Sequence, residues 1–192
     1  QAASEQPEVT TITETKGENT NTHTAVQAIS QNIVASAQEM TDASQQVIAD
    51  NIAKKEEEER LAREKAEQEA KEKAEREARE AYVRANQELL ASIIYCEAGN
   101  QPYEGQVAVG AVIMNRVKSG RYPNSIEEVI YQSGQFGPAA TGWLNRVRSS
   151  KGYSQTALQA AVDALNGSNP IGNCLYFDQG GAGMKIGAHY FH

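Results

Sequence analysis

The stretch that decides the fold of this chain runs Leu89-Leu90-Ala91-Ser92-Ile93-Ile94-Tyr95-Cys96-Glu97-Ala98-Gly99-Asn100-Gln101-Pro102. Its four large aliphatic residues stand at positions 89, 90, 93 and 94, which is the spacing of one helical face. Gly99 suits the left-handed residue that ends many helices, and Pro102 follows it closely. The stretch therefore predicts a helix that packs on a core and ends at Gly99.

Helix and strand signals continue after Pro102. The predicted elements, in order, are a helix from about Gly105 to Lys118, a third helix opened by the capping box Ser125-Ile126-Glu127-Glu128, a loop-rich stretch over 134–152, a helix from Ser154 or Thr156 through Leu165, and two short strands over 174–177 and 186–191. Together they indicate an α+β fold class, a mainly helical domain with a small C-terminal β-sheet.

Aromatic residues are concentrated after Glu88. Seven of the eight tyrosines, all three Phe and the only Trp follow it, whereas the first 85 residues contain one aromatic, Tyr82. So few large apolar side chains cannot bury enough surface to offset the entropy lost when a segment orders as a globule. We therefore predict a disordered Thr-rich tail (residues 1–23), a helical, coiled-coil-like charged spacer (residues 24–86) and one folded domain (residues 87–192).

The spacer has two kinds of sequence. Val26, Ile33, Met40 and Val47 recur every seven residues, a weak coiled-coil signal. Residues 54–80 hold nine basic and eleven acidic side chains, many in pairs four apart with the acid first, such as Glu56–Arg60. Because this segment has almost no apolar seam, a solvated rigid helix is the first interpretation and a coiled-coil or cell-wall protein partner through residues 24–86 is the alternative.

The charge distribution excludes several partner classes. The net charge is −7, and residues 87–192 carry seven acidic and seven basic side chains, with no basic stripe for nucleic acid. The acidic N-terminal region does not favour anionic membranes, and no apolar run approaches the roughly 18 residues of a spanning helix, so no membrane insertion is expected. The chain begins Gln1-Ala2-Ala3-Ser4 without Met, which favours a secreted protein whose signal peptide has been removed.

Glu97 is the strongest candidate for chemistry. It follows Ile93 by four residues and Ile94 by three, so it shares their face of the helix. Burial and the negative helix end both disfavour an ionised carboxylate, which is the property of a glycosidase general acid. A structural salt bridge, or a side chain turned outward at a frayed helix end, is the alternative.

Several separated motifs then resemble one family. They are the stretch from Ile94 to Val109 continuing to Asn115-Arg116-Val117, then Tyr122-Pro123-Asn124-Ser125-Ile126, Val129-Ile130-Tyr131-Gln132, Gly134-Gln135-Phe136 and Ile186-Gly187-Ala188-His189-Tyr190-Phe191. In this order they resemble the spore cortex-lytic cell wall hydrolases of the SleB/CwlJ type over nearly all of residues 89–192. The resemblance implies a lysozyme-like fold without a cofactor. It also implies cleavage of peptidoglycan between N-acetylmuramic acid and N-acetylglucosamine, with Glu97 as catalytic acid.

The resemblance further implies a lytic transglycosylase. Glu97 would protonate the glycosidic oxygen, and the C6 hydroxyl of the muramic sugar would attack the oxocarbenium-like centre while the Glu97 carboxylate takes its proton. One carboxylate is then sufficient. A hydrolase of the lysozyme kind would need a second one, for which Glu104 and Asp178 are the candidates.

Two departures from the family pattern bear on this site. Many members read Glu-Ala-Arg-Gly-Glu where this chain has Glu97-Ala98-Gly99-Asn100-Gln101, so a contact of the missing Arg and second Glu is in doubt. Cys96 and Cys174 stand where small residues are usual, and an exported domain with two such changes suggests a disulfide between them. Two buried thiols are the alternative.

Other residues are candidates for binding the glycan. They are Tyr103, Gln135, Phe136, Tyr176 and His189, together with Trp143. Aromatic residues fill cores as often as clefts, and a structural histidine is the other interpretation of His189.

Three other functions make different demands on the sequence. A zinc amidase needs about three protein ligands, and the folded domain offers only His189 and His192 as imidazoles, with His23 in the tail. A cysteine peptidase would pair Cys96 or Cys174 with His189. A non-enzymatic scaffold would rely on the long charged helix, and substitution of Glu97 separates it from an enzyme.

Overall fold

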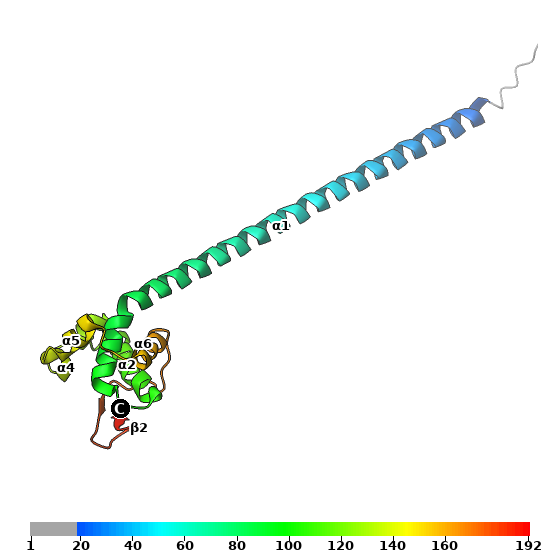
Figure 1. The fold of residues 1–192 in the computed structure, drawn as a ribbon. Coiled ribbons are helices and arrows are strands. Elements are labelled where there is room, and N and C mark those ends of the chain that lie inside the picture. The colour runs from blue at the N-terminus through cyan, green and yellow to red at the C-terminus, as the bar shows by residue number, and fades with distance from the viewer. Residues whose placement is uncertain (1–18) are drawn as a thin grey trace, which may run out of the picture. The chain divides into compact units, whose positions relative to one another are not determined.

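The computed structural model describes residues 19–192, with side chains from residue 22 onward. The described residues divide into two units, 19–67 and 68–192, and Figure 1 shows the elements of each. Most of the predicted Thr-rich tail, residues 1–18, lies outside the described residues. Residues 19–23, which the sequence assigned to the tail, are helical, because extending a helix by a residue adds a backbone hydrogen bond without a new nucleation step.

Helix α1 spans Asn19–Ala98 and is the only regular element of the first unit among its described residues. Every side chain from Thr22 to Glu67 is exposed, including Val26 and Val47 of the seven-residue pattern. None of the described helices carries an apolar stretch long enough to cross a membrane.

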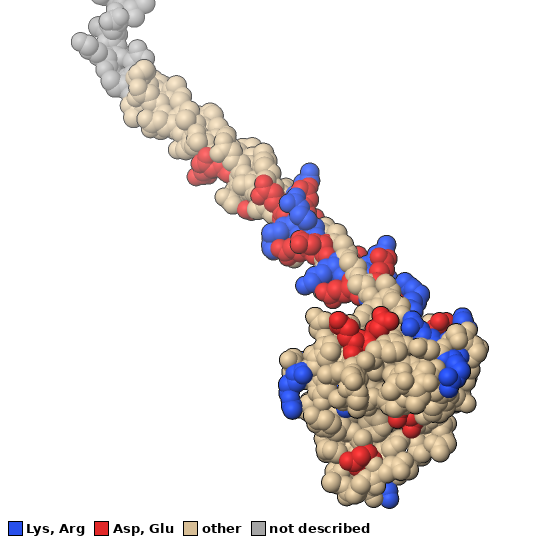
Figure 2. Space-filling view, turned by 90° about the vertical axis from the view of Figure 1, so that its left-hand side faces the viewer, with Lys and Arg blue, Asp and Glu red and all other residues tan. Residues whose placement is uncertain are grey.

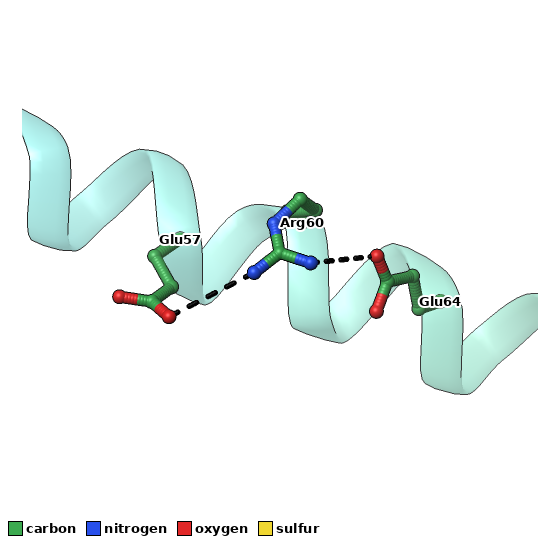
Figure 3. Close-up of polar contacts among 3 residues, drawn as sticks. All are labelled: Glu57, Arg60 and Glu64. Atoms are coloured by element: carbon green, nitrogen blue, oxygen red, sulfur yellow. Dashed lines mark hydrogen bonds and ion pairs between the residues drawn. The ribbon is translucent and has the colours of Figure 1, made fainter.

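Charged side chains of both signs are mixed along α1 from Lys54 onward, whereas residues 22–53 carry only acidic ones (Figure 2). Arg60 lies 3.7 Å from the Glu57 carboxylate and 2.8 Å from that of Glu64 (Figure 3). The sequence predicted Glu56 as the partner of Arg60, and this prediction is wrong. Carboxylates three and four residues away from Arg60 both lie within reach of its long side chain. The stabilisation contributed by such exposed ion pairs differs by only a few tenths of a kcal/mol.

The core of the second unit begins with the C-terminal turns of α1. Leu89, Leu90, Ile93 and Ile94 are all nearly or fully buried, so the predicted helical face is confirmed. They pack with apolar residues of α2 (Tyr103–Lys118) and α6 (Gln155–Leu165) in one hydrophobic cluster. The start of α6 also matches the prediction, because the Ser154 side chain accepts a hydrogen bond from the Ala157 N–H.

Gly110 allows α2 and α6 to pack closely. A Cβ at this position would lie 2.8 Å from the Ala164 Cβ and 3.1 Å from the Ile94 Cδ1. Real Cβ atoms almost never approach other carbons this closely, so the absent side chain is what lets α1, α2 and α6 meet at this point.

The segment between α2 and α6 is more helical than predicted. Helix α3 (Ile126–Tyr131) begins as expected, with the Glu128 N–H donating to the Ser125 hydroxyl at 3.2 Å. The predicted loop over 134–152 instead contains α4 (Gly137–Ala140) and α5 (Trp143–Ser150). Leu144 and Val147 anchor α5 in the core, and this burial outweighs the Gly and Ser content that indicated a loop.

The C-terminal sheet has three short strands rather than two. They are β1 (Phe177–Asp178), β2 (Met184–Ile186) and β3 (His189–Phe191), antiparallel in the order β1-β3-β2. The predicted strand over 186–191 is broken because Gly187, at φ 61°, turns the chain so that Ile186 pairs with His189. The predicted strand over 174–177 starts later, since Leu175 and Tyr176 both donate to the single carbonyl of His192.

Candidate active site

A cavity of about 500 Å³ lies where the end of α1 meets the start of α5 and the C-terminal sheet. Nine residues line it: Tyr95, Cys96, Glu97, Gly99, Asn100, Gln101, Trp143, Gln179 and His189. Glu97 is the only carboxylate in this set, which otherwise offers amide, imidazole, thiol and aromatic groups. The cavity therefore combines one potential proton donor with neutral polar groups.

Glu97 is the penultimate residue of α1 and is partly buried. Its carboxylate makes no hydrogen bond or ion pair with any other residue between 19 and 192 that would hold it in the ionised form. Burial raises the pKa of Glu97 above its ordinary value of 4.5. The side chain is therefore suited to carry a proton into the cavity at a higher pH than an exposed carboxyl group.

This raised pKa predicts how stability depends on pH. A carboxyl whose pKa is higher in the folded than in the unfolded chain stabilises the folded state below its unfolded pKa, and that contribution is lost as pH rises through the folded value. We expect the parent protein to lose stability relative to Glu97→Gln as pH increases from 4.5. Urea denaturation followed by near-UV circular dichroism at several pH values measures this difference.

His189 also titrates at this cavity, but it is present in both proteins and its contribution cancels in the comparison. A stability difference that stays constant across this pH range would show that Glu97 titrates as it does in the unfolded chain.

The turn after Glu97 is built differently from the prediction. Gly99 is not in the left-handed conformation; its N–H donates to the Tyr95 carbonyl at 3.0 Å, so the last helical turn simply continues through it. A Cβ on Gly99 would lie 2.5 Å from the Tyr95 oxygen. A side chain at this position, such as the Arg that many family members carry, would require this turn to shift.

Gln101 connects this turn to the sheet. Its side-chain Oε1 accepts a hydrogen bond from the Ala188 N–H at 2.8 Å, and its carbonyl accepts one from the buried Gln106 side chain at 3.0 Å. A Cβ on Gly187 would lie 2.6 Å from the same Oε1. Although an amide replaces the family's second Glu, an acceptor oxygen is retained, and it fixes the turn that leads into His189.

His189 lies in the wall of the cavity with only 5% of its surface exposed. Its ring packs edge-on against Phe177, with centroids 5.2 Å apart, and burial lowers its pKa. Its Nδ1 is buried without a hydrogen-bond partner among the described residues. The site therefore holds a neutral imidazole with an unused polar atom.

The structure places four of the sequence candidates outside the cavity lining. The Tyr103 hydroxyl donates to the Asp163 carboxylate, which raises the pKa of Tyr103 to about 12 together with desolvation, the larger cause. Phe136 is a core residue beneath the Arg116 guanidinium, whose carbon lies 5.3 Å from the ring centre. Gln135 is exposed in the turn before α4, and Tyr176 stacks on His192.

The two candidates for a second carboxylate do not line the cavity either. Glu104 is exposed in the first turn of α2. Asp178 accepts a hydrogen bond from the Gly180 N–H at 2.7 Å and lies 3.9 Å from His192 Nε2. Neither carboxylate therefore faces Glu97 across the cavity as a second catalytic group.

Sequence reasoning missed Tyr95, Asn100 and Gln179 as lining residues. Tyr95 and Asn100 could have been found from their positions two and three residues from Glu97. Gln179 has no such signal, because it lies in the Gly-rich turn between β1 and β2 and reaches the cavity only through the sheet.

The predicted Cys96–Cys174 disulfide is wrong, because both cysteines are free. Cys96 lines the cavity, whereas Cys174 belongs to a loop held on α2 by the Asn115 side chain, which donates to the carbonyls of Gly172 and Cys174 at 2.8 and 2.9 Å. Burial, and secondarily the Glu97 charge, raise the pKa of Cys96 to about 11. Its thiol is therefore protonated near neutral pH and is a poor nucleophile.

Among residues 19–192, no group of three or more His, Cys, Asp and Glu side chains is close enough to hold a metal ion.

Comparison with known proteins identifies relatives of the folded domain. The family model described as Cell Wall Hydrolase matches residues 100–191, a range that begins just after Glu97. The spore cortex-lytic enzyme of Bacillus cereus is 40% identical over 96 residues, which cover 50% of this chain and 35% of that protein. The corresponding Bacillus subtilis enzyme is 42% identical over 89 residues, or 46% of this chain and 28% of that protein.

The matched region thus spans about a third of these relatives. The solved catalytic domain of the Bacillus cereus SleB protein is 36% identical, with 55% of this chain and 88% of that chain aligned and a TM-score of 0.49. The matched family model and the level of identity agree with the motifs found between Ile94 and Phe191. Residues 100–191 therefore belong to the Cell Wall Hydrolase family, in agreement with the resemblance to the SleB/CwlJ type.

Proposed function

We propose that residues 87–192 form a catalytic domain that cleaves peptidoglycan glycan strands between N-acetylmuramic acid and N-acetylglucosamine, as a lytic transglycosylase. The observation that carries this proposal is that Glu97 is the only carboxylate among the residues lining the cavity. The similarity to enzymes named spore cortex-lytic supports a peptidoglycan substrate.

A single carboxylate favours this reaction over hydrolysis. Glycosidases that use water place two carboxyl groups on either side of the scissile bond, about 5 Å apart when retaining and roughly 6.5–9.5 Å apart when inverting. The lining of this cavity supplies only one such group, and Glu104 and Asp178 lie outside it. An intramolecular nucleophile removes the need for a second carboxylate.

The reaction then has two steps. Protonated Glu97 gives its proton to the glycosidic oxygen, and the bond from C1 of the muramic sugar to that oxygen breaks, leaving positive charge at C1. The C6 hydroxyl oxygen of the same sugar bonds to C1, and the Glu97 carboxylate takes the hydroxyl proton. The product is a 1,6-anhydro end, and Glu97 is protonated again.

His189 is the substrate-binding candidate that this geometry supports best. It lines the cavity, and the neutral state favoured by its burial suits a contact with an uncharged hydroxyl or N-acetyl group. The exposed, highly charged helix of residues 24–86 would act as a solvated spacer for a secreted enzyme at the cell wall.

End-group chemistry of the products tests this function. Purified glycan strands are digested, reduced with borohydride and weighed by mass spectrometry. We expect muramic ends that lack one water and do not take up hydrogen on reduction. Reducible muramic or glucosamine ends would contradict transglycosylation, and newly released peptide amino groups would contradict glycan cleavage altogether.

A further inference from the structure

Trp143 is the first residue of α5 and the only Trp in the chain. It lines the Glu97 cavity, and 41% of its surface is exposed. The next residue, Leu144, is fully buried. Helix α5 is therefore anchored in the core by its aliphatic side chain, while its largest apolar side chain is left in the cavity.

The backbone around Trp143 holds the indole in place. Gly142 adopts a left-handed conformation with φ 73°, and its carbonyl accepts a hydrogen bond from the Arg146 N–H at 3.2 Å. The Asn145 side chain accepts a further hydrogen bond from the Tyr131 hydroxyl, which connects α5 to α3. The exposed ring thus stands on a helix fixed at its start and along its side.

The chemistry of the cavity limits what this indole can bind. The lining contains no Lys or Arg, so the cavity offers no cation to pair with an anion. Its other groups include the amides of Asn100 and Gln179 and the neutral imidazole of His189. A flat aromatic face beside neutral donors and acceptors suits a pyranose ring, which presents C–H groups on one face and hydroxyl and acetamido groups at its edge.

We infer that Trp143 is the stacking surface for an N-acetylhexosamine ring of the glycan strand, and that it sets affinity rather than the rate of the chemical step. This inference rests on the proposed glycan substrate. The indole contacts the sugar both before and during bond cleavage. Its removal therefore weakens the binding of the substrate and of the transition state equally.

A fluorescence titration tests the binding directly, because the chain has a single Trp. The full chain carrying Glu97→Gln is titrated with tetra-N-acetylchitotetraose. We expect a saturable blue shift of the emission as the sugar excludes water from the indole. No spectral change up to saturating sugar would overturn the inference.

Kinetics on soluble, peptide-free glycan strands provide the second test. Trp143→Ala is expected to raise KM about tenfold with kcat unchanged, and Trp143→Phe to raise it less, since a smaller aromatic face remains. Tyr82→Ala is the matched control: Tyr82 is 42% exposed and lies outside this cavity, so KM should not change.

A fall in kcat at constant KM in Trp143→Ala, or an equal rise in KM in the Tyr82 control, would also overturn the role of Trp143. Failure of the proposed function has a different signature. It would appear as undiminished cleavage by Glu97→Gln, whereas the sugar titration reports on Trp143 whether or not cleavage occurs.

Discussion

Replacing Glu97 with Gln is expected to lower the rate of glycan cleavage by about three orders of magnitude. The amide cannot donate a proton to the glycosidic oxygen or accept one from the attacking hydroxyl. In the proposed mechanism both transfers use this one side chain. The appearance of anhydro ends from purified glycan strands, followed by mass spectrometry, measures the rate.

The fold should survive this substitution. Gln has nearly the shape of Glu, and the Glu97 carboxylate has no hydrogen bond within residues 19–192 whose loss would destabilise the helix end. The near-UV circular dichroism of the variant should therefore match that of the parent.

Glu104→Gln and Asp178→Asn are the matched controls, because they remove the other candidate carboxylates outside the cavity. Both should cleave within about twofold of the parent rate, since neither group takes part in proton transfer. Cleavage at the parent rate by Glu97→Gln would remove the basis of the proposed mechanism. A comparable loss in either control would instead indicate a two-carboxylate hydrolase.

Gly110→Val is expected to reduce the free energy of unfolding by about 3 kcal/mol. The new side chain would begin with a Cβ 2.8 Å from the Ala164 Cβ and 3.1 Å from the Ile94 Cδ1. To relieve these contacts, α2 and α6 must separate in a core that is otherwise closely packed. The better helix propensity of Val offsets only about half a kcal/mol.

Urea denaturation followed by near-UV circular dichroism measures this effect on the folded unit, where the aromatic residues lie. Gly137→Val is the control, because a Cβ on Gly137 meets no atom within 4 Å and its backbone is not left-handed. Adding Ala164→Gly to Gly110→Val should restore part of the lost stability. Equal stability of the two Val variants would refute the close approach of α2 and α6.

Local sequence signals predicted most of the helices. The aliphatic residues at 89, 90, 93 and 94, the Ser125 and Ser154 caps, and the glycines after α2 and α6 act within a few residues of each other. They could therefore be interpreted without knowledge of the rest of the fold. Helices α4 and α5 were missed because they are short and Gly-flanked, and α5 is stabilised by burying Leu144 and Val147 in a core built from distant parts of the sequence.

The site was harder to predict than the fold. Glu97 could be found because its helical register and the neighbouring motif both point to it. The rest of the cavity is lined in part by Trp143, Gln179 and His189. These residues are far from Glu97 in the sequence and are brought to the same cavity only by tertiary packing. Phe136 illustrates the opposite error: its motif suggested a sugar contact, whereas its ring fills the core between Arg116 and Phe177.

The strand order β1-β3-β2 has a consequence for when the cavity is complete. The central strand is the last of the three in the chain, so β1 and β2 have no partner until residues 189–191 are present. A chain that is synthesised or threaded from its N-terminus carries Glu97 on a finished helix long before His189 reaches the opposite wall. In the proposed mechanism, competence to cleave therefore depends on residues 189–191, which complete the sheet and bring His189 to the cavity wall.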